Sequence, residues 1–322
     1  MERDERLARK RWLNLLRLFV SVGALALIIW QINLPEALKE LREAELGLLL
    51  IAALLFALSL VIRAGRWLLL IRSLNPHVPF VRLLRLYFVA AFFNTFLPSS
   101  FGGDVVRALE LTRDADTSAA VGTVFLDRMS GLMTLALMGL LILPFQIGRL
   151  DDWLIWLLII LTSGILLVGG IILEGRLLRK LTTRLPFGLS LTGDGALAKI
   201  YAAISSCGWR SIVGAFGVSI VFNVINVIIN WLCGRAVGTG ISLGHFFVVT
   251  PLIAVSGLIP SIGGWGVREA ISAAIFSSVD DEKAVAFGFV LGLVMASNGL
   301  VGGLIYLAES LLKTTTTSAV ED

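Results

Sequence analysis

The sequence has 322 residues, of which 57% are hydrophobic and only 16% are charged, with a formal net charge of +4. Soluble domains carry about one-quarter charged residues, so this composition excludes a soluble globular protein. The apolar residues form long runs rather than short alternating strands, which favours membrane helices over a membrane barrel. We therefore predict an all-α polytopic membrane protein.

A basic segment, residues 1–17, precedes the first apolar run and predicts a cytoplasmic N-terminus. Six uncharged runs are each about long enough to cross a bilayer, which takes roughly 20 residues. They are Leu18–Pro35, Leu46–Ile62, Met129–Gly148, Trp153–Leu173, Ser211–Gly234 and Ala284–Ala308. The membrane domain is expected to span residues 18–309, and the polar residues 310–322 predict a disordered, cytoplasmic tail.

Two further apolar stretches, Leu86–Gly103 and Ala236–Val267, carry the same broken-helix motif. Proline cannot continue the helical hydrogen-bond ladder, and glycine pairs permit backbone angles that other residues resist. Paired interrupted segments indicate the binding site of a transporter. The shared residues are Pro98, Gly102, Gly103 and Arg107 in the first copy, and Pro260, Gly263, Gly264 and Arg268 in the second.

The positive-inside rule sets the topology. If both motif segments are re-entrant, most of the 27 Lys and Arg residues, including those of loop 174–210, lie on the cytoplasmic face. The two motifs then enter from opposite faces, and residues 46–148 repeat, inverted, as residues 211–308. The alternative is that both motif segments cross the membrane, which gives eight crossings.

Each glycine pair begins the second half of a broken helix, where unpaired backbone N–H groups carry partial positive charge. At membrane depth such an end is a ready anion site. A guanidinium group fits two phosphate oxygens, which makes Arg107 and Arg268 the predicted phosphate ligands. The alternative is internal ion pairing, of Arg107 with Asp104 and of Arg268 with Glu269 or a distant acid. Asp104 and Glu269 would then gate the empty site.

Other polar residues at membrane depth complete the candidate set. Arg63 and Arg66 share a helix face and either anchor the membrane boundary or capture a headgroup. Asp127 and Arg128 precede a crossing, and a polar stripe (Asn223, Asn226 and Asn230) either bonds another helix or lines the site. The predicted substrate-binding residues are Gly102, Gly103, Asp104, Arg107, Gly263, Gly264, Arg268, Glu269, Arg66, Arg128 and Asn226.

Catalytic and cofactor motifs are absent from the sequence. It has neither a nucleotide-binding G-x-x-x-x-G-K-[ST] loop nor an H-E-x-x-H metal motif. Its histidines, His77 and His245, form no triad pattern, and its cysteines, Cys207 and Cys233, have no metal or redox spacing. We therefore predict no enzymatic activity, no cofactor, no bound metal and no nucleic-acid partner.

Four short motifs, taken together in their order along the chain, resemble the lysylphosphatidylglycerol synthase transmembrane-region family. The resemblance covers about residues 12–310, although some relatives carry an acid where Gly131 stands here. It implies a flippase-like protein of a bacterial or archaeal cytoplasmic (inner) membrane, which moves or presents phospholipids. The motifs are Arg63–Trp67, Pro98–Arg107, Asp127–Gly131 and Gly263–Glu269.

Bifunctional members of that family fuse this membrane region to a soluble aminoacyltransferase domain. The chain ends at Asp322, soon after the last predicted crossing, so we expect a stand-alone member without synthase activity. The predicted function is translocation of an anionic phospholipid or lipid-linked phosphate without ATPase activity. The alternatives are an accessory protein that binds a lipid precursor for a lipid-modifying enzyme or glycosyltransferase, and a small-solute or ion transporter. No oligomeric state is predicted.

Overall fold

The computed structural model describes residues 44–74, 77–97, 101–148, 150–182, 191, 195–257, 259, 262–276, 279 and 281–318. Its regular structure is helical, and no strand occurs within those residues. This confirms the predicted all-α polytopic membrane fold. The basic segment 1–17, the first predicted crossing, and the motif prolines Pro98 and Pro260 lie outside the described residues.

Five described helices are long and apolar enough to cross a membrane, as predicted for this part of the chain. Because they are apolar on most faces, they suit burial in lipid rather than in water. A short 3-10 turn, η1 (Leu143–Phe145), extends the second of them. The five are α3 (Leu46–Arg72), α6 (Thr117–Ile142), α7 (Asp152–Glu174), α10 (Gly208–Ala236) and α13 (Asp281–Ser318).

Three helix boundaries differ by more than two turns from the sequence-based expectation, and one of them is the end of α3, which lies at Arg72 rather than at Ile62. α6 begins at Thr117 rather than at Met129, so Asp127 and Arg128 lie inside the helix and not before it. Both ionise, so a search for uncharged runs started this segment too late. α13 continues to Ser318, through residues that we expected to be a disordered tail.

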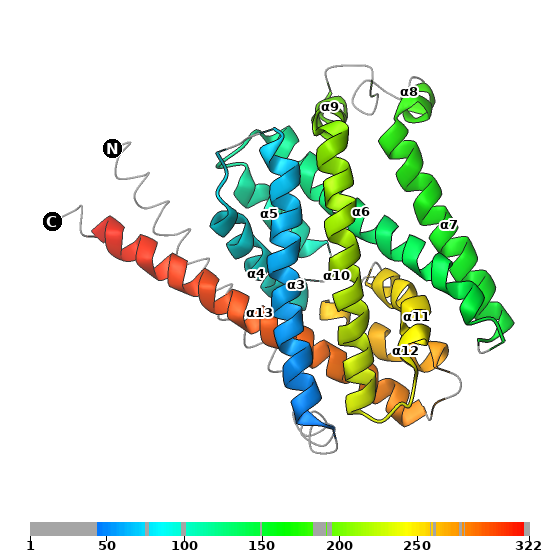
Figure 1. Cartoon of the computed structure of the whole chain (residues 1–322). Coiled ribbons are helices and arrows are strands. Elements are labelled where there is room, and N and C mark those ends of the chain that lie inside the picture. Colours follow the sequence, from blue (N-terminus) through cyan, green and yellow to red (C-terminus); the bar gives the residue numbers. More distant parts are fainter. Residues whose placement is uncertain are drawn as a thin grey trace.

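The centre of the fold is an antiparallel pair, α3 and α10, which pack along their length (Figure 1). The backbone N–H of Glu45, before α3, donates to the carbonyl oxygen of Ala236 at the end of α10, over 3.0 Å. At the other end the Cys207 thiol lies 3.9 Å from the carbonyl oxygen of Leu70. These contacts define two ends of the molecule, the Leu70 end and the Ala236 end.

The first broken segment is a helical hairpin of α4 (Phe80–Phe96) and α5 (Gly102–Leu111). Its two outer ends are tied together, since Arg82 near the start of α4 donates to Asp114 beyond α5 over 3.0 Å. The same guanidinium reaches the backbone oxygen of Glu110 at 3.1 Å. α4 therefore enters and α5 leaves at the Leu70 end, as predicted for a re-entrant segment.

The second broken segment forms a hairpin of α11 (Leu243–Ser256), η2 (Ile262–Gly264) and α12 (Val267–Ile275). The rings of Phe246, early in α11, and Phe276, just after α12, have centroids 5.6 Å apart. This hairpin follows α10 and so opens at the Ala236 end, opposite the first. In Figure 1 the α4–α5 hairpin lies in the upper half and α11–α12 in the lower half. The two segments are therefore hairpins that open at opposite ends of the α3–α10 pair.

Two short helices, α8 (Arg176–Thr182) and α9 (Ala196–Ser206), lie at the Leu70 end, within the predicted loop 174–210. α9 packs on α6 and buries Tyr201 and Ile204. Both cysteines are free and buried. These helices close one end of the bundle and take no part in the site described below.

Close backbone packing holds the first hairpin against α13. A Cβ atom at Gly302 would overlap the backbone oxygen of Phe88 on α4, and one at Gly303 would lie 2.8 Å from the Phe92 ring. Small residues let membrane helices approach this closely, because apolar burial itself gives little drive for association in lipid. The α4–α13 contact is thus set by glycine, and it fixes the depth of α4.

Replacement of Gly302 by alanine is expected to destabilise the fold by roughly 1–3 kcal/mol, the usual cost of overpacking. Gly170→Ala is the matched control, because a Cβ atom there meets nothing within 4 Å. Thermal unfolding of the purified proteins in detergent measures both. Equal melting temperatures for the two variants would contradict the glycine-dependent contact.

Candidate functional site

A carboxylate at the centre of the bundle organises the buried charge. Asp127 on α6 has no exposed surface. Its Oδ1 accepts from Arg66 Nε on α3 over 2.8 Å, and its Oδ2 accepts from Arg107 Nη1 on α5 over 3.2 Å. The hydroxyl of Tyr87 on α4 also donates to Oδ2. One side chain therefore joins α3, α4, α5 and α6.

A second carboxylate extends this network toward the surface. Asp104 on α5 accepts from Arg107 Nη2 over 2.7 Å and, through its other oxygen, from Arg128. Arg107 therefore bridges both acids, which is the ion-pair alternative left open by the sequence. Arg66 also donates, through Nη1, to the hydroxyl oxygen of Ser219 on α10 over 2.8 Å. Burial of these charges is tolerated because each is paired and hydrogen-bonded.

Aromatic rings enclose the paired arginines. The Arg107 guanidinium carbon lies 4.1 Å from the centroid of the Tyr87 ring and 4.8 Å from that of Trp67. Trp67 is itself held by a hydrogen bond from its indole N–H to Thr123 over 3.2 Å. Such ring faces stabilise a desolvated cation. They also hold Arg107 in one orientation.

Arg63 forms no ion pair with an acid among the described residues. Its guanidinium lies over the rings of Tyr87 at 5.0 Å and Phe222 at 5.2 Å. Its Nε is buried and has no hydrogen-bond partner among the described residues. The sequence placed Arg63 beside Arg66 on one helix face but could not tell which of them meets an acid. The structure pairs Arg66 and leaves Arg63 facing a cavity.

The tip of the second hairpin meets the first hairpin at mid-length of the bundle. Gly263 and Gly264 adopt φ values of 62° and 79°, which only glycine takes at little cost. A Cβ atom at Gly263 would overlap the backbone oxygen of Thr95, one residue before the end of α4. The glycine pair therefore serves both the turn and the contact between the two hairpins.

Arg268 follows this turn and is buried. Its Nη2 donates to the carbonyl oxygen of Gly263 over 2.8 Å, whereas Nη1 is buried without a hydrogen-bond partner among the described residues. Both carboxylate oxygens of Glu269 are also buried and without such a partner. The predicted ion-pair alternative for Arg268 with Glu269 is therefore wrong, because the two side chains do not meet.

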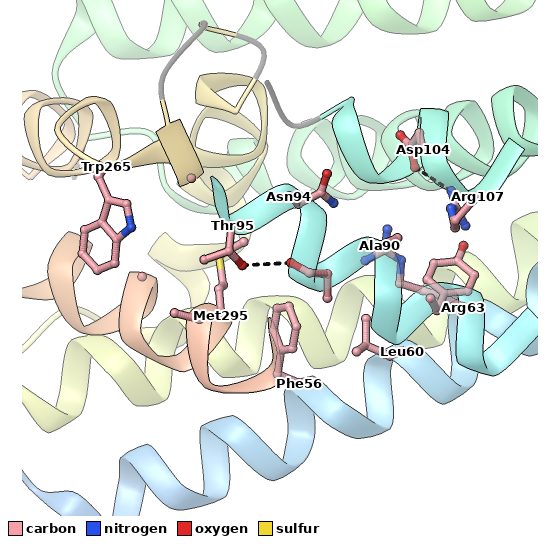
Figure 2. A pocket seen from close by; sticks show the side chains of 15 residues that line it. Phe56, Leu60, Arg63, Ala90, Asn94, Thr95, Asp104, Arg107, Trp265 and Met295 are labelled. Carbon is pink, nitrogen blue, oxygen red and sulfur yellow. Dashed lines mark hydrogen bonds and ion pairs between the residues drawn. The ribbon is translucent and has the colours of Figure 1, made fainter. Parts of the chain in front are cut away.

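Two adjoining cavities lie where the hairpins meet, with volumes of about 80 and 220 Å³. Figure 2 shows the smaller one, with Asp104 and Arg107 at one end and Trp265 at the other. Arg268 lines the larger cavity, and Arg63 lines both. The polar or charged side chains around the larger cavity are Ser59, Arg63, Asn94, Asn226, Asn230, Thr250 and Arg268.

The asparagine stripe of α10 divides between two roles. Asn223 donates to the backbone oxygen of Gly131 on α6 over 3.0 Å, which is the interhelical bond expected of a structural residue. Asn226 and Asn230 instead line the larger cavity. Asparagines three and seven residues apart on one helix thus divide between packing and lining.

The first glycine pair differs from its predicted role. The N–H of Gly103 donates to Asn94 Oδ1 over 2.7 Å, so this donor is already used within the hairpin. Neither Gly102 nor Gly103 lines either interior cavity. The structure brings Asp104, Arg107, Arg66 and Arg128 into one network, and Gly263, Gly264, Arg268 and Asn226 around the larger cavity.

The fold and this buried charge define a multi-pass membrane protein whose interior holds two helical hairpins and a cluster of arginines. The family described as lysylphosphatidylglycerol synthase TM region matches residues 14–302, and the chain belongs to it. The UPF0104 membrane protein PH1989 of Pyrococcus horikoshii is 21% identical over 304 residues, which cover 84% of this chain and 89% of that protein. The family resemblance inferred from the motifs is confirmed.

Asp127→Asn is expected to destabilise the protein by roughly 3–5 kcal/mol, because it leaves Arg66 and Arg107 buried beside a neutral amide. Asp114→Asn removes the half-exposed pair with Arg82 and should cost about 0–1 kcal/mol. Thermal unfolding in detergent compares the two. A loss for Asp127→Asn no larger than that of the control would show that this network does not support the fold.

Proposed function

We propose that the protein moves a phosphate-bearing lipid headgroup between the two leaflets of a membrane. The phosphate would sit in the larger cavity between Arg63 and Arg268, with Asn226 and Asn230 as neutral donors. The observation that carries this proposal is a buried guanidinium nitrogen on each of Arg63 and Arg268, beside the same cavity and without a hydrogen-bond partner among the described residues. Guanidinium N–H groups and phosphate oxygens form strong, charge-assisted hydrogen bonds.

The charge balance of the interior supports an anionic substrate. Five arginines and three carboxylates lie in or beside this interior, namely Arg63, Arg66, Arg107, Arg128, Arg268, Asp104, Asp127 and Glu269. The excess is positive in a region where unpaired charge is costly. An entering phosphate would relieve that cost, whereas a cation would increase it. This favours an anionic headgroup over a cationic solute.

We propose that two halves of the chain form an inverted repeat and give alternating access to this cavity. When α3, α4, α5 and α6 are matched with α10, α11, α12 and α13, the main helix–helix contacts within and between the two sets have counterparts. The α4–α13 contact corresponds to α11–α6, α5–α6 to α12–α13, and α3–α4 to α10–α11. Inverted repeats that meet at a midplane site are a common basis of transport, in which one half rocks against the other.

The basic Leu70 end would face the cytoplasm of a bacterial or archaeal cell, with both chain termini on that side. Transport would run downhill or be coupled to a gradient, as expected for a chain without a nucleotide-binding motif. A lipid-modifying enzyme or glycosyltransferase would supply or consume the transported lipid. The other predicted ligand residues, Gly264 included, would shape the cavity rather than bind the phosphate.

Reconstitution into liposomes with fluorescent phospholipids and a dithionite quench tests the proposal. Protein-dependent exposure of inner-leaflet label is expected. Arg63→Gln and Arg268→Gln should each slow transport about ten-fold or more, since a hydrogen bond to a charged group contributes roughly 1.5–3 kcal/mol. Arg235→Gln is the control, because this exposed arginine at the end of α10 lines neither cavity.

Transport by the two cavity variants at the wild-type rate, in folded protein, would contradict the phosphate site. Folded wild-type protein that moves none of the lipids would contradict the transport function itself. Binding of lipid without movement would then favour the accessory role predicted as an alternative.

A further inference from the structure

A third cavity lies outside the bundle interior, between α5 and α6, and has a volume of about 500 Å³. We call it the α5–α6 groove. Its walls are apolar except for Asp104 and Arg128. Several of its side chains face outward, with exposed fractions of 44% for Phe101, 54% for Val105 and 64% for Leu109.

The shape of the α5–α6 groove follows from helix geometry. Phe101, Val105 and Leu109 are four residues apart and so form one stripe along α5 and the turn before it. On α6 the lining runs from Val121 to Leu132, which corresponds to about 16 Å at the helical rise per residue. A narrow apolar trough of that length suits one extended hydrocarbon chain.

The polar end of the groove is an ion pair that borders the interior. Asp104 lines both the groove and the smaller interior cavity. Its Oδ1 accepts from Arg107 inside the bundle, whereas its Oδ2 accepts from Arg128 in the groove. The Arg128 guanidinium also lies 4.1 Å from the centroid of the Phe101 ring. The Asp104–Arg128 pair therefore separates the groove from the cavity.

We propose that the α5–α6 groove is the lateral opening through which a phospholipid reaches the interior, and that it seats an acyl chain of that lipid. This rests on the proposed transport function. The combination of an apolar trough and a cation at its edge complements an acyl chain joined to a phosphate. A free phosphate has no apolar part that could contact the α5–α6 groove.

The exchange at the opening is balanced in charge. The lipid phosphate replaces the Asp104 carboxylate on Arg128, so the arginine keeps an anionic partner throughout. Asp104 remains paired with Arg107 through its other oxygen, so it is never left as a lone buried carboxylate. Arg63 lies next along the wall of the same interior cavity and receives the phosphate.

A tryptophan in the groove tests the opening. Val105→Trp should fill the trough and slow fluorescent-lipid transport about ten-fold or more, because a filled apolar site resists an added chain. Leu137→Trp is the matched control, since Leu137 is 47% exposed on α6 and does not line the groove. Equal transport rates for the two variants would overturn the proposal that the lipid enters through the α5–α6 groove. An inactive wild-type protein would instead overturn the proposed function.

Photolabelling gives a readout that does not depend on transport. Phosphatidylglycerol with a diazirine in its acyl chain, in phosphatidylcholine vesicles, should label peptides covering 101–132. Excess unlabelled phosphatidylglycerol should suppress this labelling, as should Val105→Trp and Arg128→Gln. Exposed α7 residues such as Ile160 serve as the reference for ordinary lipid contact. If unlabelled phosphatidylglycerol suppresses labelling of the groove no more than labelling of α7, the proposal is overturned.

Discussion

The burial of Asp127 is the constraint on which the rest of the structure depends. A carboxylate with no exposed surface needs partners, and it takes them from Arg66, Arg107 and Tyr87 on three different helices. These bonds place the first hairpin against α3 and α6 at a defined depth. A buried ion pair of this kind is costly to break, because either partner left alone would be a desolvated charge. The network therefore positions the first hairpin, whose residues line both interior cavities.

The buried arginines are of two kinds, those that pair with carboxylates and those that line the larger cavity. Arg66 and Arg107 form ion pairs with carboxylates and hold helices together. Arg63 and Arg268 line the larger cavity and form no ion pair among the described residues, and each has a buried guanidinium nitrogen without a hydrogen-bond partner there. The same residue type thus serves structure on one side of the site and ligand recognition on the other. The Asp104–Arg128 pair connects the two roles, since it belongs to the network and also borders the lipid-facing groove.

The two hairpins give the site its symmetry and its access. They open at opposite ends of the central α3–α10 pair, and their tips meet where Gly263 touches the backbone of Thr95. A ligand in the cavities is therefore bounded by one hairpin from each side, so a movement of either hairpin would change which face it reaches. Glycine at the tip and at the α4–α13 contact lets these backbones approach closely.

Composition and charge alone determined the helical membrane fold. Uninterrupted apolar runs located the five long described helices, and most helix ends lie within one or two turns of the predicted position. The repeated Pro and Gly-Gly motifs, read with the positive-inside rule, also predicted that the two short segments turn back, and each of them forms a hairpin in the structure. Both depend on local physics, namely transfer of side chains into lipid and the backbone freedom of glycine. Only the tertiary structure decided which arginine is paired and which is available, because a guanidinium meets its carboxylate across helices. Arg63 and Arg66 lie three residues apart on one helix face, and nothing in that spacing reveals that Asp127 reaches one of them and not the other.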